Sequence, residues 1–113
     1  MKMYDVFNGD ADGICALIQL RLAVPAETIL ITGVKRDIAL ARQVPTTEPV
    51  KATILDISLD INRKDVDALL AVGSKVFYVD HHFPGESLPD APGFTALIDS
   101  LRAAGLAETA GWL

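Results

Sequence analysis

Residues 51–80, KATILDISLDINRKDVDALLAVGSKVFYVD, decide the fold. The stretch Lys51–Asp56 is apolar and rich in β-branched residues, which predicts a strand, and Ser74–Asp80 predicts another. Between them, Asn62–Val72 has helical periodicity, and Gly73 is the candidate residue that ends this helix. A strand, a helix and a strand in this order predict two parallel strands joined by a right-handed crossover.

The same alternation continues on both sides of this unit. The other expected elements are strands over Lys2–Asn8, Glu27–Thr32 and Phe94–Ile98, helices over Asp12–Ala23 and Asp99–Ala110, and a short helix over Lys35–Gln43. The apolar runs of the strands are nearly continuous, as they are when both faces of a sheet are covered. The sequence therefore predicts a Rossmann-like α/β fold: an open parallel sheet of four to five strands with helices on both faces.

The first expected helix allows a more detailed prediction. Asp12 is its candidate N-cap, and Pro25 follows its end. Cys15, within the helix, is expected to be a small buried hydrophobic residue, and Arg21 is expected to point outward. The residues expected on the buried face are Ile14, Leu17, Ile18 and Leu22.

Composition limits the class of protein. The chain has 113 residues, half of them hydrophobic, which fits one domain with a core and excludes a disordered chain. Its single cysteine excludes an internal disulfide and a cysteine-rich zinc site. The net charge of −5 argues against long-range capture of nucleic acid. No apolar run reaches the length of a membrane span and no signal-peptide pattern is present, so a cytoplasmic protein is expected.

Carboxylates follow three of the expected strands. Asp10 and Asp12 come after the first strand, Asp56 ends the third and Asp80 ends the fourth. The carboxyl ends of parallel strands share one edge of the sheet, so these four side chains are expected to meet there. Clustered carboxylates repel one another unless cations lie nearby. With the adjacent His81–His82 pair, this oxygen-rich set suits Mn²⁺ or Mg²⁺ better than a metal bound by thiolates.

Each of these residues also has a purely structural interpretation. Asp12 can be only a helix cap, and Asp56 can be an ordinary turn residue after a strand. A histidine pair after a strand is often part of a solvated loop. The argument for a metal site therefore depends on the residues coming together at one edge.

The motifs resemble those of a known family. Asn8–Gly13 (NGDADG), the strand-end Asp56, and Val79–His82 (VDHH) are similar in order and placement to the motifs of the DHH phosphoesterase family. That family includes RecJ-type exonucleases, oligoribonucleases, cyclic-dinucleotide phosphodiesterases and manganese-dependent inorganic pyrophosphatases. The resemblance covers roughly the first hundred residues.

The resemblance implies a site for two Mn²⁺ ions, with Mg²⁺ or Co²⁺ as substitutes. Such a site hydrolyses a phosphoester or a phosphoanhydride with a metal-activated water. Asp56 matches the aspartate that bridges both ions, and His82 matches the catalytic histidine that faces the substrate phosphate. By position in the motifs, the implied metal ligands are Asp10, Asp12, Asp56, Asp80 and His81.

The sequence departs from the family pattern in two places. Many members have a histidine four residues before the first aspartate, where this chain has Val6. Full-length members also have a later metal-binding aspartate and a second, substrate-binding domain, for which too few residues follow His82. We therefore expect one domain over residues 1–113 that resembles the N-terminal DHH domain, without the C-terminal domain. A homodimer is expected to cover the apolar surface left exposed.

The expected partner is a phosphorylated small molecule or a short oligonucleotide, and no membrane. Two other functions stay open. One is a non-catalytic remnant that still binds metal or nucleotide. The other is a receiver-like signalling domain with Asp56 as phosphoacceptor, although no lysine ends the fifth strand near Ile98 as a receiver requires.

Overall fold

The computed structural model describes residues 1–34, 37–80, 89 and 93–98. Its strands form one parallel sheet of five strands in the order β2-β1-β3-β4-β5. The strands are β1 (Met3–Asn8), β2 (Ile29–Gly33), β3 (Lys51–Leu55), β4 (Lys75–Asp80) and β5 (Phe94–Ile98). The predicted open parallel sheet is confirmed, and every strand begins or ends within two residues of its expected bounds.

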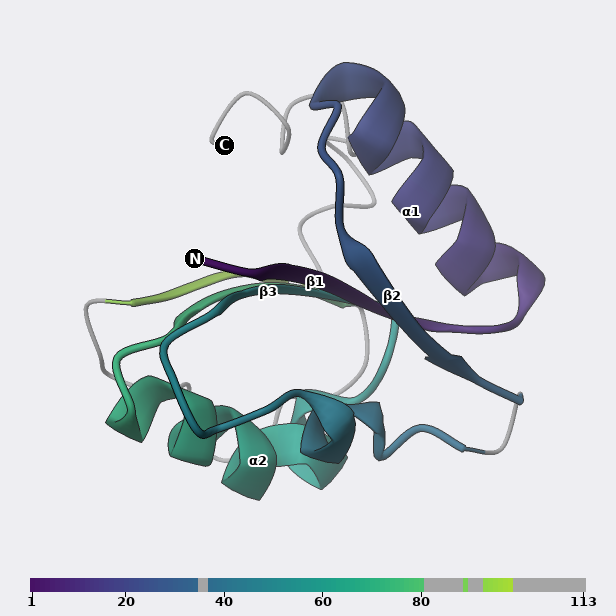
Figure 1. Cartoon of the computed structure of the whole chain (residues 1–113). Helices are drawn as coiled ribbons and strands as arrows, with labels where there is room; N and C mark the ends of the chain where they lie inside the picture. The colour runs from purple at the N-terminus through teal and green to yellow at the C-terminus, as the bar shows by residue number, and fades with distance from the viewer. Residues whose placement is uncertain (35–36, 81–88, 90–92, 99–113) are drawn as a thin grey trace.

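Helices cover both faces of the sheet, as predicted (Figure 1). Helix α1 (Ala11–Ala23) lies on one face, and α2 (Leu59–Ala71) lies on the other beside the 3₁₀ helix η1 (Leu40–Gln43). The short helix expected over residues 35–43 is therefore wrong in extent, because a single 3₁₀ turn takes its place. The final helix expected over residues 99–110 lies outside the described residues.

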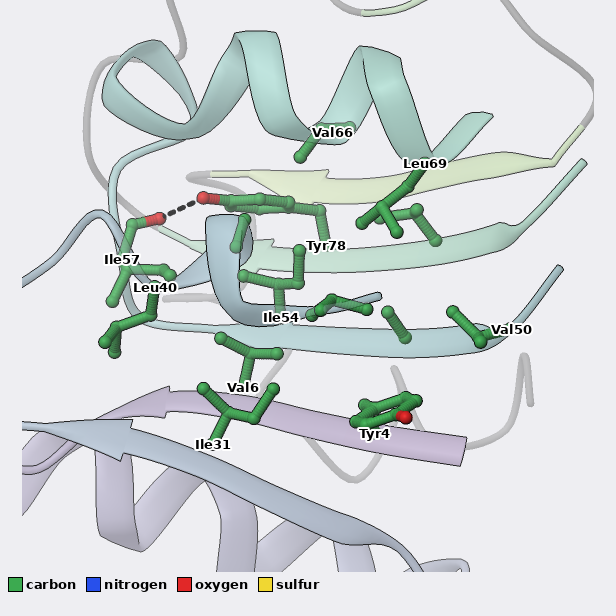
Figure 2. Packing of buried hydrophobic residues seen from close by; sticks show 14 of the residues in the cluster. Tyr4, Val6, Ile31, Leu40, Val50, Ile54, Ile57, Val66, Leu69 and Tyr78 are labelled. Atoms are coloured by element: carbon green, nitrogen blue, oxygen red, sulfur yellow. Dashed lines mark hydrogen bonds between the residues drawn. The ribbon is translucent and has the colours of Figure 1, made fainter. Parts of the chain in front are cut away.

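The larger part of the core fills the space between the sheet and α2. Figure 2 shows Val66 and Leu69 of α2 above Ile54 of β3 and Tyr78 of β4. Leu40 of η1 joins the same cluster. All five of these side chains are fully buried. This layer explains why β3 and β4 have nearly continuous apolar sequences: their residues alternate between this cluster and the one beneath α1.

The smaller cluster, on the α1 side, corrects the predicted orientation of that helix. Leu20 is fully buried against Phe7 and Leu55, and Leu17 is half-buried there. Cys15 is exposed, contrary to expectation. Also exposed, and not buried as expected, are Ile14, Ile18 and Leu22.

The reason for this orientation is a buried ion pair that ties α1 to the sheet. Asp5, in the middle of β1, is completely buried, and Arg21 reaches inward to it with two hydrogen bonds of 2.7 Å. Thr28 donates a third hydrogen bond of 2.8 Å to the same carboxylate. The guanidinium therefore fixes the rotation of α1 about its axis.

Within the described residues, no helix is long and apolar enough to cross a membrane.

Candidate functional site

The strand order places a topological switch point, here termed the crevice, between the carboxyl ends of β1 and β3. After β1 the chain enters α1 on one face, and after β3 it enters α2 on the opposite face (Figure 1). The two connections therefore lead to opposite faces of the sheet. In open parallel sheets of this order, ligands bind at this switch point.

The register places the acidic strand ends at one level. Phe7 pairs with Leu55, and Leu55 pairs with Val79. One residue further along each strand come Asn8, Asp56 and Asp80, in a row across β1, β3 and β4. Neighbouring strands lie about 4.8 Å apart, so the backbone of this row spans about 10 Å. The register therefore places the backbone of Asn8, Asp56 and Asp80 at one edge of the sheet, as the parallel strand order predicts.

The loop after β1 holds Asp10 in a defined position. The Asn8 side chain accepts a hydrogen bond of 3.3 Å from the Asp10 backbone N–H. The Asp10 Oδ1 atom accepts one of 2.9 Å from the Gly13 N–H, so Asp10 is the N-cap of α1. The expectation that Asp12 caps this helix is wrong. A cap at Asp12 would make Gly13 the first helical residue, whereas α1 begins at Ala11. The second oxygen of Asp10, Oδ2, accepts no hydrogen bond from any residue of the described part.

Two glycines make this tight loop possible. A Cβ atom at Gly13 would lie 2.0 Å from the carbonyl oxygen of Asn8, and one at Gly9 would lie 2.3 Å from that of Gly33. The Gly9 N–H donates to the same Gly33 oxygen at 3.1 Å. The first turn of α1 is therefore pressed against the end of β1, which brings Asp10 close to the crevice.

Asp12 lies in the first turn of α1 and is exposed. Its charge is favourable there, because the N-terminus of a helix carries a partial positive charge. The structure thus supports a structural role for Asp12.

Asp56 has a backbone conformation that is rare outside glycine. Its φ angle is 58°, in the left-handed region that Asp tolerates at a cost of about 1 kcal/mol. Its N–H donates to the Val79 carbonyl oxygen at 2.9 Å. In the next residue, the Ile57 carbonyl oxygen accepts a hydrogen bond of 2.5 Å from the buried Tyr78 hydroxyl (Figure 2). The chain is therefore held to β4 on both sides of the left-handed residue, and the half-buried Asp56 stands at the crevice.

The remaining predicted ligands are only partly placed. Asp80 is the last residue of β4, where its backbone pairs with Ile98, while its side chain and both histidines, His81 and His82, lie outside the described residues. Among the side chains that are described, no three from Asp, Glu, His and Cys are grouped so as to hold one metal ion. The other members of the predicted ligand set, the Asp80 side chain and His81, lie outside the described residues.

Sequence reasoning overlooked two contributors to the site. Asn8 holds the loop through its side-chain oxygen, and Tyr78 anchors the segment after Asp56 from the neighbouring strand. An asparagine at the end of a strand, two residues before a capping aspartate, is a local signal for the first. The second has no local signal, because the two residues are far apart in the sequence.

Comparison with known proteins gives no family for this chain. No protein-family model matches it, and no curated protein and no solved structure matches it either.

Proposed function

We propose that this chain is a metal-dependent phosphoesterase domain of the DHH type, which hydrolyses a phosphoester or a phosphoanhydride. The observation that carries the proposal is the placement of Asp10, Asp56 and the Asp80 backbone at one end of three adjacent strands, beside the β1–β3 switch point. The parallel strand order brings these three positions to one end of the sheet, and Asp10 also caps α1, but neither fact requires an acidic residue at all three positions. A shared ligand accounts for the three acidic residues.

The ligand that suits these groups is a pair of divalent cations, with Mn²⁺ as the first choice. The proposed metal ligands are Asp10, Asp12, Asp56, Asp80 and His81. When bound, such ions supply a hydroxide at neutral pH and stabilise charge on phosphoryl oxygens. Carboxylate oxygens and one imidazole are the donors that Mn²⁺ accepts well.

The residues of the chain orient these donors before any ligand binds. The hydrogen bond from Gly13 holds one oxygen of Asp10, which leaves the other oxygen for the crevice. The left-handed backbone at Asp56 turns the chain at the end of β3 and sets the direction of that side chain. His82 is proposed to donate a hydrogen bond to a phosphoryl oxygen, where a fixed donor is worth most as negative charge develops. The substrate is proposed to be a phosphorylated small molecule or a short oligonucleotide.

Two alternative substitutions of Asp10 separate its proposed role in metal binding from its role as the helix cap. Asp10→Asn keeps the cap, since asparagine caps as well as aspartate, but it removes the charge; Asp10→Ala removes both. We expect both variants to lose Mn²⁺ affinity by at least about tenfold, the lower end of what even a supporting residue of a metal site contributes. Only Asp10→Ala is expected to lose about 1 kcal/mol of stability.

The matched control for charge is Glu48→Gln, an exposed acidic residue before β3, at the opposite edge of the sheet. Asp56→Asn is the second test variant, because asparagine also tolerates the left-handed region. Calorimetric titration with Mn²⁺ at fixed ionic strength measures the wild type and the four variants. Equal affinity of wild type, Asp10→Asn and Asp56→Asn would rule out the proposed ligands.

Turnover distinguishes an enzyme from a binding remnant. The proposal expects Mn²⁺-dependent release of product from a model phosphodiester or from pyrophosphate, and its loss in His82→Ala and Asp10→Asn. If Mn²⁺ binds through Asp10 and Asp56 but no product forms from either substrate, the non-catalytic remnant is the better description.

The receiver-like alternative is supported by one feature. Asp56 directly follows β3 in a sheet of order 2-1-3-4-5, the order of doubly wound folds that include receivers. Within β5, however, the sequence FTALI contains no lysine. Incubation with acetyl phosphate and Mg²⁺ followed by intact-mass measurement tests this function. A mass increase of one phosphoryl group that is absent in Asp56→Asn would favour it over hydrolysis.

A further inference from the structure

The Asn8 side chain, at the end of β1, is a buried polar group of which only one end has a partner. The residue is 7% exposed. Its Oδ1 atom accepts the hydrogen bond of 3.3 Å from the Asp10 N–H, which identifies the oxygen end of the amide, since the nitrogen would face that N–H as a second donor. The Nδ2 atom carries two N–H groups, and no atom of the residues that the structure describes accepts a hydrogen bond from it. Buried polar groups nearly always have a partner, so this nitrogen indicates an acceptor from elsewhere.

The other asparagine of the chain shows how a structural amide is satisfied in this fold. Asn62 of α2 is completely buried. Its Oδ1 atom accepts from the Ala41 N–H at 3.1 Å, and its Nδ2 atom donates to the carbonyl oxygens of Ile38 and Ser58, at 2.8 Å each. The Asn8 nitrogen has no such pair of oxygens in the described part of the chain. Asn62 therefore joins parts of the fold, whereas the nitrogen of Asn8 is free to bind a ligand.

The first turn of α1 adds further donors beside this amide. Gly13 donates its N–H to Asp10 Oδ1, but the N–H groups of Ala11 and Asp12 have no acceptor among the described residues. The first N–H groups of a helix carry a partial positive charge, and phosphate groups bind to them. The turn is packed against Asn8 itself, because Gly13 lacks the Cβ that would lie 2.0 Å from the Asn8 carbonyl oxygen. The free amide nitrogen and the free backbone donors therefore belong to one short, closely packed segment.

Carboxylates in the same segment limit the class of ligand. The Oδ2 atom of Asp10 is not used by the helix cap, and Asp12 is exposed in the first turn. These negative charges repel a free anion. A ligand that suits both the donors and the carboxylates must bring negative oxygens and positive charge together. A phosphoryl group accompanied by a divalent cation does so, because its oxygens can be shared between N–H donors and the cation.

We propose that the Asn8 Nδ2 group binds an oxygen of the substrate phosphoryl group beside the N-terminus of α1. This role rests on the proposed function, which supplies the cation, and it assigns recognition of the phosphoryl group to Asn8. The hydrogen bond from the Asp10 N–H fixes the amide before the substrate arrives, so the nitrogen loses little freedom on binding. Asn8 is thus a binding residue that takes no proton in the reaction.

Two substitutions remove this donor in different ways. Asn8→Asp keeps the shape of the side chain and an oxygen for the Asp10 N–H, but it replaces the amide nitrogen by an acceptor. Asn8→Ala removes the amide without adding a charge. The matched control is Gln43→Glu, which makes the same change from amide to carboxylate at an exposed position of η1, on the opposite face of the sheet from α1.

The probe is methylphosphonate, whose carbon–phosphorus bond a phosphoesterase does not hydrolyse, added with and without Mg²⁺. Mg²⁺ takes the place of Mn²⁺ because it is diamagnetic and leaves NMR signals sharp. Chemical-shift changes at fixed ionic strength give the dissociation constant. With Mg²⁺, we expect this constant to rise at least about tenfold in both Asn8 variants and to change less than about twofold in Gln43→Glu. Urea unfolding checks that the three variants are folded.

The side-chain NMR signals of asparagine give a direct readout in the wild-type chain. The Asn8 NH₂ pair is the pair that is absent from the spectrum of Asn8→Asp, and the Asn62 pair is the internal reference. We expect methylphosphonate to shift the Asn8 pair and to leave the Asn62 pair in place. An Asn8 pair that does not move while methylphosphonate binds overturns the proposal.

The possible outcomes distinguish this role of Asn8 from the proposed function. If Mg²⁺ binds through Asp10 and Asp56 but both Asn8 variants bind methylphosphonate as tightly as the wild type, the role of Asn8 is wrong and the metal site stands. If methylphosphonate binds equally well without Mg²⁺ and the Asn8 variants still weaken it, the role of Asn8 is supported and the metal site is wrong. A wild type that binds no methylphosphonate under either condition overturns the proposal.

Discussion

Replacing Arg21 with alanine is expected to lower the free energy of unfolding by about 3–5 kcal/mol. The structure explains the size of this effect. Asp5 is completely buried and accepts three hydrogen bonds, two from Arg21 and one from Thr28, while the Arg21 side chain is only 18% exposed. Without the guanidinium, a buried carboxylate keeps a single neutral donor. Its uncompensated charge, and not the loss of the pair's net attraction, produces most of the cost.

A double-mutant cycle tests this explanation directly. Asp5→Val alone leaves the arginine without its acid and is expected to cost a similar amount. Asp5→Val combined with Arg21→Met replaces both ends by apolar groups and is expected to cost much less than the sum, within about 1–2 kcal/mol of wild type. The coupling between the two sites is therefore expected to exceed about 2 kcal/mol.

Urea unfolding followed by circular dichroism gives these values, with equal m-values as the check that only stability has changed. Arg42→Ala is the matched control: Arg42 lies in the 3₁₀ helix η1, but its 3.4 Å contact with Asp37 lies at the surface, and its loss is expected to cost at most about 0.5 kcal/mol. A cost below about 1 kcal/mol for Arg21→Ala, or simple additivity in the cycle, would refute the reasoning.

Three further substitutions follow from buried contacts, and urea unfolding measures each of them. Gly13→Ala is expected to cost about 2 kcal/mol or more, because the added Cβ would lie 2.0 Å from the Asn8 carbonyl oxygen; a stabilised protein, as helix propensity alone predicts, would contradict this. Asn62→Ala is expected to cost about 2–3 kcal/mol, since the fully buried amide bonds three backbone groups; a cost under about 1 kcal/mol would contradict it. Tyr78→Phe is expected to cost about 1–2 kcal/mol through the Ile57 carbonyl oxygen, and an unchanged stability would show that this bond contributes nothing.

The strands were predictable because their signal is local. Runs such as residues 51–55 and 75–80 are apolar and β-branched, and the crossover rule converts their alternation with helices into a parallel sheet. Gly73, the predicted cap of α2, directly follows the actual C-cap residue Val72, and its φ angle of 87° is one that other residues avoid. The shared edge of Asp10, Asp56 and Asp80 follows from the same reasoning, since parallel strands that end in aspartate must present them together.

The orientation of α1 was not predictable in this way. Its sequence offers apolar residues almost all round, so periodicity alone allowed Ile14 and Ile18 to be buried. The choice was made by contacts with the sheet: the absence of a side chain at Gly13, which allows the helix to touch Asn8, and the attraction of Arg21 to Asp5. The N-cap moved with it, from the expected Asp12 to Asp10.

The amino-acid sequence by itself determines that this chain forms a parallel α/β sheet and that the strand ends followed by Asp10, Asp56 and Asp80 lie at one edge, because both depend on hydrophobic pattern and strand direction. Tertiary structure alone decides which side chains of α1 are buried, which aspartate caps that helix, and how the backbone turns at Asp56. These features depend on atoms that are distant in the chain and meet only in the folded protein, where close packing and buried charge leave one arrangement of low free energy.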